Sequence, residues 1–240
     1  MRRARCLRSS SRKQASAFGH RALSEAREIV VCVHGYLSHG AGMYLIKRRL
    51  EREYGLKVAL FSYPSVRGAL DENAAALAAF IRKMNPDAAH IVGHSLGGVL
   101  ALRMLANDSG FLPGRVVCLG SPLTGSRAAT FLNSLVWAED IVGKSVPEAM
   151  VHRSANEWAA HVAGERDIGV IAGNVPFGIG RFLADFKEDN DGTIAVAETR
   201  LPGARDHIVL PVSHKGMLVS AAVADQAAAF IRRGTFLKDP

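Results

Sequence analysis

Residues 89–98 have the sequence Ala-His-Ile-Val-Gly-His-Ser-Leu-Gly-Gly, and this stretch decides the fold. The apolar run 89–93 predicts a buried strand, and the residues 96–106 that follow predict a helix. Ser95 stands at the turn between them, in the centre of a Gly-x-Ser-x-Gly motif. Such a turn holds a serine in a weakly allowed backbone conformation, and its glycines let strand and helix pass closely. We therefore expect Ser95 to be a nucleophile.

Outward from this motif, strands and helices alternate along most of the chain. The expected strands are 29–33, 57–63, 89–93, 115–119, 168–172 and 207–211. The expected helices are 43–53, stopped by Gly55, then 71–84, capped by Asp71, then 96–106 and 220–232. Near-continuous apolar strands in this alternation are typical of a buried parallel sheet. The sequence thus predicts an α/β fold, with a mostly parallel sheet and helices on both faces.

Length and composition indicate one globular domain. The 240 residues are 48% apolar and 22% charged, and no apolar run approaches the roughly 20 residues of a membrane-spanning helix. We expect residues 29–240 to form the domain, in which the irregular segment 123–165 is a short cap. No integral membrane segment is expected, and the oligomeric state is left open.

The positive charge gathers at the N-terminus. Of the net charge of +8, residues 1–28 contribute +6, from eight basic residues against two glutamates. The nearly neutral remainder argues against a nucleic-acid partner. Residues 1–28 lack the apolar core of a secretory signal and are rich in Arg and Ser, as transit peptides are. We expect a disordered basic extension, with a targeting role or peripheral membrane contact as the alternative.

Cysteine use favours a reducing compartment. The chain has Cys6, Cys32 and Cys118, an odd number without paired spacing, and the last two fall in apolar runs. Buried thiols of this kind behave as small hydrophobic side chains. A disulfide framework is therefore not expected, and a cytoplasmic location is favoured.

When a serine attacks a carbonyl carbon, the carbonyl oxygen becomes an oxyanion, and two backbone N–H groups are needed to stabilise it. The N–H of Leu96 is one candidate, because it lies at the start of the helix after Ser95. The second should come from the loop after an earlier strand, where His34 and Gly35 follow the run 29–33. We expect Tyr36 to supply it, with Leu37 as the alternative, and we interpret His34 as a support of this loop.

A nucleophilic serine of this fold needs an acid and then a histidine, in that order along the chain. The histidines after Ser95 are His152, His161, His207 and His214. Active sites of parallel sheets gather at the carboxyl ends of the strands. His214 lies just past the carboxyl end of the last expected strand, whereas His207 opens that strand. We therefore expect His214 to be the base.

The acid should lie before His214, in an acidic stretch. The candidates are Asp185, Glu188, Asp189, Asp191 and Asp206. Asp191 is favoured because it precedes a glycine and lies between two expected strands, and Asp189 is the main alternative. We expect neither a metal nor another cofactor, because the histidines near Ser95 lack metal-site spacing and a serine mechanism needs none.

These residues resemble a known family. The set His34-Gly35-Tyr36, Gly93 to Gly98, Asn190 to Thr193 and Val212-Ser213-His214 is similar to the bacterial lipase and esterase branch of the α/β-hydrolases. It also resembles deacylases related to the GPI-inositol-deacylase group. The resemblance covers about residues 29–233. It implies an α/β-hydrolase fold, with Ser95 as nucleophile, Asp191 as acid, His214 as base and Tyr36 as an oxyanion donor.

Hydrolysis of a carboxylic ester through an acyl-enzyme is therefore the expected function, with a small-molecule or lipid ester as substrate. Two alternatives remain. One is a thioesterase or lipid deacylase with the same three residues, and the other is a hydrolase-like binding protein that has lost activity. The segment 123–165 is shorter than the lid of true lipases of this branch, which argues against long-chain triglycerides.

Overall fold

The fold is built on one sheet of six parallel strands. The computed structural model describes residues 26–124, 156–177 and 188–238. The strands are β1 (Glu28–Val33), β2 (Val58–Phe61), β3 (Ala88–His94), β4 (Val116–Leu119), β5 (Ile168–Gly173) and β6 (Asp206–Leu210). Their order across the sheet is β2-β1-β3-β4-β5-β6, and each neighbouring pair is parallel. The predicted parallel α/β architecture is confirmed.

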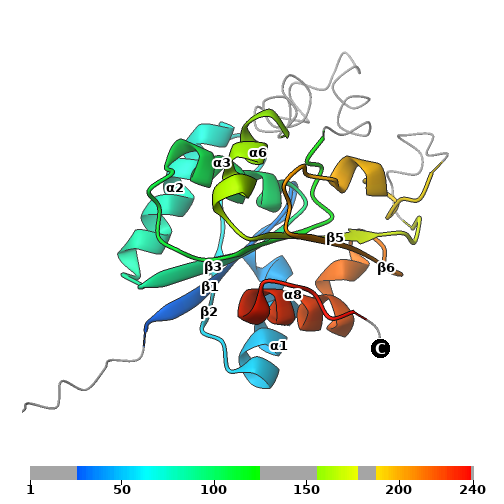
Figure 1. The fold of residues 1–240 in the computed structure, drawn as a ribbon, viewed down its shortest axis with the longest axis horizontal. Coiled ribbons are helices and arrows are strands. Elements are labelled where there is room, and N and C mark those ends of the chain that lie inside the picture. The colour runs from blue at the N-terminus through cyan, green and yellow to red at the C-terminus, as the bar shows by residue number, and fades with distance from the viewer. Residues whose placement is uncertain (1–25, 125–155, 178–187, 239–240) are drawn as a thin grey trace, which may run out of the picture.

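Helices cover both faces of the sheet, as Figure 1 shows. The helices are α1 (Tyr44–Tyr54), α2 (Leu70–Lys83), α3 (Leu96–Asn107), α6 (Asn156–Glu165) and α8 (Ala221–Arg233). Helices α1 and α8 pack on one face, and α2, α3 and α6 pack on the other. Short 3-10 turns, η1 (Gly40–Met43), η3 (Val196–Thr199) and η4 (Gly216–Leu218), lie in the connections.

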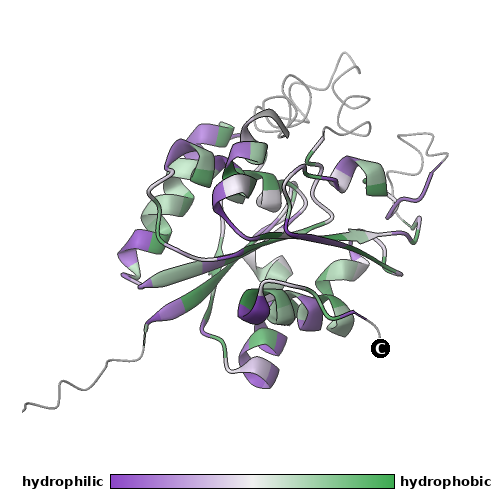
Figure 2. Cartoon of the chain, in the orientation of Figure 1, coloured by the Kyte–Doolittle hydropathy of each residue, from purple (hydrophilic) through white to green (hydrophobic). Residues whose placement is uncertain are grey.

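The strands divide their side chains between two cores. Because successive residues of a strand point to opposite faces, Val31 and Ile91 join the core under α2 and α3. Val30 and Val92 join the core under α1 and α8. In Figure 2 the helices carry both hydrophilic residues (purple) and hydrophobic residues (green), as amphipathic helices between core and solvent do. Burial on both faces explains why the strands are near-continuous apolar runs.

Helix ends follow the sequence signals in most places. Gly55 ends α1 in the left-handed conformation with φ of 63°, as predicted. Ser220 caps α8 by accepting a hydrogen bond from the N–H of Val223. The prediction that Asp71 caps its helix is wrong. Helix α2 begins at Leu70, and the Asp71 carboxylate binds the Arg103 guanidinium of α3 instead.

The folded body begins slightly before the expected boundary. Strand β1 starts at Glu28, and the backbone N–H of Arg27 donates to the Asp87 carboxylate at 2.8 Å. The rest of the proposed basic extension, residues 1–25, lies outside the described residues. Of the proposed cap 123–165, residues 125–155 are likewise outside them, and α6 packs on α3 as a crossover helix that leads into β5.

Two further expectations concern burial. Cys32 and Cys118 are fully buried, and burial raises the pKa of each thiol to about 12. Both therefore stay protonated and inert, as predicted for core cysteines. No helix in the described part of the chain is long and apolar enough to cross a membrane.

Candidate active site

Ser95 lies on a sharp turn between β3 and α3. It has a positive φ of 54° with ψ of −124°, which is a strained conformation for a residue with a side chain. The backbone N–H of Ser95 donates to the Leu119 carbonyl of β4 at 2.8 Å, which anchors the turn to the sheet. The side chain is only 8% exposed. This is the predicted strand–turn–helix setting of a nucleophilic serine.

The glycines of the motif are required by close backbone contacts. A Cβ on Gly93 would lie 2.5 Å from the Cα of Gly98, where the strand passes the helix. A Cβ on Gly97 would lie 2.3 Å from the carbonyl oxygen of Val33 at the end of β1. No side chain fits at either position, so the turn can form only with glycine there.

Asp191 and His214 form a buried pair near this turn. The Nδ1 of His214 lies 2.7 Å from Oδ2 of Asp191, and the carboxylate is 1% exposed. The other oxygen, Oδ1, accepts the backbone N–H groups of Thr193 at 2.9 Å and Ile194 at 2.7 Å. The backbone N–H of His214 donates to the Asp191 carbonyl at 2.8 Å. Both carboxylate oxygens and the backbone carbonyl of Asp191 are therefore bound, which fixes this side chain against the His214 imidazole.

The other acidic candidates lie elsewhere. Asp189 and Glu188 are exposed, and Asp185 falls outside the described residues. Asp206 lies at the opposite end of β6, where its carboxylate accepts the backbone N–H groups of His207 and Phe236. Among the described candidates, only Asp191 contacts His214.

The other histidines are also separate from this pair. His207, which was expected to open the last strand, lies near the start of β6, where it is partly buried and its Nε2 lies 2.9 Å from the Thr199 hydroxyl. His161 is on α6 and pairs with Glu165 of the same helix at 3.6 Å. His152 lies outside the described residues.

Ser95 and the Asp191–His214 pair meet through His94. The Nε2 of His94 lies 2.9 Å from the His214 carbonyl oxygen, and the two imidazole centroids are 4.6 Å apart. His94 is the residue directly before Ser95. Among the described residues, neither the Ser95 hydroxyl nor Nε2 of His214 has a hydrogen-bond partner, and His214 is only 8% exposed. Neither atom is therefore held by another side chain or by the backbone in the described part of the chain.

The loop after β1 lies against Ser95. A Cβ on Gly35 would be 2.9 Å from the Cβ of Ser95, so the residue directly before Tyr36 is packed against the serine. Tyr36 is half-buried, whereas the Leu37 side chain is 71% exposed. Helix α3 starts at Leu96, so its first N–H groups face the same region.

His34 anchors this loop from behind. Its Nδ1 donates to the Gly35 carbonyl at 2.8 Å, and its Nε2 accepts the Tyr63 N–H at 3.2 Å. The Tyr63 hydroxyl donates in turn to the His34 carbonyl at 3.0 Å. Burial lowers the pKa of His34, so the ring stays neutral in this role. These contacts match the predicted supporting role.

Two glycines that the sequence analysis did not single out leave the space that Asp191 and His214 occupy. Gly120, after β4, has φ of 54°, and a Cβ there would lie 3.0 Å from Asp191 Oδ2 and 3.2 Å from His214 Nδ1. A Cβ on Gly173, at the end of β5, would lie 2.9 Å from the Cβ of Asp191. Their one signal in the sequence is a glycine at the carboxyl end of an expected strand.

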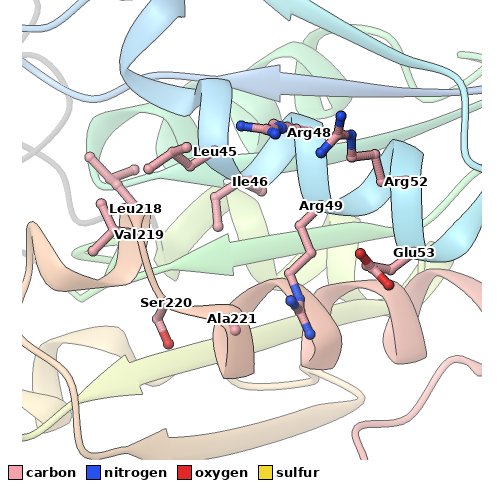
Figure 3. A pocket seen from close by; sticks show the side chains of 10 residues that line it. All are labelled: Leu45, Ile46, Arg48, Arg49, Arg52, Glu53, Leu218, Val219, Ser220 and Ala221. Atoms are coloured by element: carbon pink, nitrogen blue, oxygen red, sulfur yellow. The ribbon is translucent and has the colours of Figure 1, made fainter.

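Figure 3 shows a different surface feature, a groove of about 240 Å³ between α1 and the start of α8. Arg49 points from α1 toward α8, where its guanidinium binds the Asp225 carboxylate. None of Ser95, Asp191 and His214 lines this groove. In the described part of the chain, no three His, Cys, Asp or Glu side chains are grouped to hold a metal ion.

The chain is similar to known proteins in sequence and in fold. The sequence profile described as the alpha/beta hydrolase family matches residues 30–235. A search of curated proteins finds no match. The mature lipase BlEst2 of Bacillus licheniformis shares the fold with a TM-score of 0.70 and 19% identity, over 88% of this chain and 94% of that one.

Two other solved structures are also similar. The product of lin2722 from Listeria innocua has a TM-score of 0.59 and 12% identity, over 89% of this chain and 96% of that one. The metagenomic carboxyl esterase MGS0156 has a TM-score of 0.58 and 20% identity, over 80% of this chain and 65% of that one. At such identities these likenesses show a common fold, and the profile match identifies the family. This chain belongs to the alpha/beta hydrolase family.

Proposed function

We propose that the protein is a serine hydrolase that cleaves carboxylic esters, with Ser95 as nucleophile, His214 as base and Asp191 as its orienting acid. The observation that carries the proposal is the buried 2.7 Å contact between Asp191 and His214, beside a serine with φ of 54° at a strand–helix turn. The same arrangement serves nucleophilic acyl transfer in unrelated enzymes.

In the first half of the reaction, Ser95 Oγ attacks the ester carbonyl carbon while Nε2 of His214 takes its proton. The carbonyl electrons move onto oxygen, and the oxyanion is stabilised by the N–H groups of Tyr36 and Leu96. When the tetrahedral intermediate collapses, the bond to the alkoxy oxygen breaks, and His214 returns the proton to that leaving oxygen. An alcohol departs, and an acyl-Ser95 ester remains.

In the second half, water attacks the acyl-enzyme as His214 takes one of its protons. The bond between Ser95 Oγ and the acyl carbon breaks, and Oγ regains the proton from His214. The carboxylic acid leaves, and the enzyme returns to its starting state. In each half, the Asp191 carboxylate stabilises the imidazolium that His214 becomes. The carboxylate is already held in place for this by the N–H groups of Thr193 and Ile194, which donate to it.

The test is turnover of p-nitrophenyl butyrate by Ser95→Ala and by the wild type. We expect the variant to lose at least about 10³-fold in kcat, because only binding and the oxyanion donors would remain. Ser109→Ala is the matched control, since Ser109 is an exposed serine at the far end of the sheet. Labelling by a fluorophosphonate probe should occur in the wild type and the control and be absent in Ser95→Ala.

The two measurements also separate the alternatives. A wild-type protein that neither hydrolyses acyl esters nor takes the probe is a binding protein, and the proposal is then wrong. A protein that takes the probe but leaves p-nitrophenyl butyrate uncleaved is then assayed with an acyl-thioester, and cleavage of that compound identifies a thioesterase. A series of p-nitrophenyl esters with increasing acyl length then defines which acyl-chain length the enzyme prefers.

A further inference from the structure

His94 is a buried side chain that the mechanism above leaves without a role. It ends β3, directly before Ser95, and it is 6% exposed. Its ring lies among the three loops of the candidate site: the turn of Ser95, the loop of Gly35 and the loop of His214. A polar ring in such a position must have its hydrogen bonds satisfied by specific partners.

The contact with His214 fixes the protonation of His94. Its Nε2 lies 2.9 Å from the His214 carbonyl oxygen, and a carbonyl can only accept, so Nε2 carries the proton and donates. The two rings also pack at 4.6 Å between centroids with an interplanar angle of 47°. His94 therefore holds both the backbone and the ring of His214, which lies 120 residues further along the chain.

The other side of the ring meets the loop that carries Tyr36. A Cβ on Gly35 would be 3.2 Å from Nδ1 of His94, so the Gly35 backbone passes directly over that edge of the ring. We propose that His94 is a positioning residue that fixes the His214 loop and the Gly35 loop relative to Ser95. This inference rests on the proposed function, because it concerns the geometry of that reaction.

A neutral ring suits this position. Burial, together with the nearby imidazoles of His214 and His34, lowers the pKa of His94 to about 3, although the hydrogen bond to the His214 carbonyl acts in the opposite direction. These are the titratable groups that face His94, with Asp191 behind His214. Because His94 stays neutral, it does not oppose the positive charge that His214 gains when it takes the Ser95 proton. A lysine or arginine donor at this position would oppose that charge.

The experiment compares His94→Phe with His94→Gln in the full-length protein. Phenylalanine keeps a flat ring but cannot donate, whereas the glutamine amide can reach the His214 carbonyl with an N–H. We expect kcat on p-nitrophenyl butyrate to fall about 10²-fold in His94→Phe with KM changed less than about two-fold, since a displacement of about 1 Å has such a cost. In His94→Gln we expect kcat within about ten-fold of the wild type.

The control is the same pair of substitutions at His90, which lies on β3 at the opposite end. These variants should keep the wild-type kcat even if they lose stability. Circular dichroism and thermal unfolding establish that each protein is folded.

The outcomes separate this inference from the proposed function. A folded His94→Phe with wild-type kcat overturns the positioning role, as does a KM rise with unchanged kcat. If His94→Phe does not fold, His94→Gln still decides: a kcat more than about ten-fold below that of the wild type, in a folded protein, overturns the inference. Failure of the wild type to react with the fluorophosphonate probe instead refutes the proposed function.

Discussion

Strand β3 carries a buried histidine near each end, and the two differ in what they hold. At the amino end, Nδ1 of His90 accepts the backbone N–H of Arg115 at 3.1 Å, and its Nε2 lies 3.7 Å from the exposed Glu28 carboxylate. At the carboxyl end, His94 bonds to the backbone of His214, whose own ring is paired with Asp191. The first histidine ties two neighbouring strands together, and the second joins loops.

The same contrast extends to the carboxylates at the two edges of the sheet. Asp167, at the amino edge, binds Arg115 at 3.1 Å and Arg205 at 3.0 Å and is partly exposed. Asp191, at the carboxyl edge, is buried and pairs with His214, whose Nε2 has no hydrogen-bond partner among the residues that the structure describes. Although the amino edge has a depression of about 820 Å³, the Arg115 and Asp167 side chains that line it are bound to each other. Size of a hollow is therefore a poorer guide to chemistry than the partners of its side chains.

The largest effect on kcat should come from removing the charge of Asp191, whereas the same change at Asp167 should not affect kcat. Asp191→Asn should lower kcat by about 10³ to 10⁴-fold, because an amide donor at this position favours the wrong imidazole tautomer of His214. Asp167→Asn should leave kcat unchanged and lower the free energy of unfolding by about 1 kcal/mol, since its ion pairs are partly exposed. Turnover of p-nitrophenyl butyrate and urea unfolding measure the two quantities.

Equal activity losses in the two variants would contradict the contrast between the edges. So would an Asp191→Asn variant with wild-type kcat and an Asp189→Asn variant with a large loss. The latter result would return the acid to Asp189, the alternative that the sequence left open.

A smaller effect should follow from adding one methyl group at a positive-φ glycine. In Gly120→Ala the new Cβ would press on Asp191 Oδ2 and His214 Nδ1, at 3.0 Å and 3.2 Å. In Gly55→Ala, with φ of 63° at the end of α1, no atom lies within 4 Å. Both variants share the backbone cost of about 1 kcal/mol. Only Gly120→Ala should also lose activity, by about ten-fold or more in kcat.

The matched backbone strain makes this pair informative. Thermal unfolding should show a loss of stability in both variants, while p-nitrophenyl butyrate turnover should differ. If Gly55→Ala also loses activity, the effect is global loosening and not displacement of the Asp191–His214 pair.

The fold was predictable because its signals are local. Apolar strands, amphipathic helices and glycine stops such as Gly55 depend on neighbouring residues, and the structure reproduces them within a few positions. The placement of His214 and Ser95 was predictable too, because strand ends in a parallel sheet converge. Asp71 shows the limit: its expected role as a helix cap yields to an ion pair with Arg103 on another helix.

What the sequence could not supply depends on contacts between distant segments. Asp189 and Asp191 stand two residues apart in one acidic loop, and only the packing of that loop buries one and exposes the other. The clearance at Gly120 and the contact of His94 with His214 involve partners 71 and 120 residues away or more. No local pattern encodes such partners, which is why these two residues were missed.

The last contrast concerns the pH dependence of stability and not turnover. The pKa of His94 in the folded protein, about 3, lies below the ordinary value of 6.5, so between these values the unfolded chain binds more protons. Stability from the neutral ring is fully present above pH 6.5 and is lost as pH falls toward 3, by up to about 1.4 kcal/mol per pH unit for one proton.

In His94→Gln this titration is gone, so urea unfolding at pH 6.5, 5.5 and 4.5 should give a shallower decline in the free energy of unfolding than in the wild type. His90→Gln should flatten the decline less. Burial also lowers the pKa of His90, but the Glu28 carboxylate at 3.7 Å partly restores its protonated form. A larger flattening in His90→Gln would mean that the amino end of β3, and not the end beside Ser95, holds the more strongly desolvated histidine.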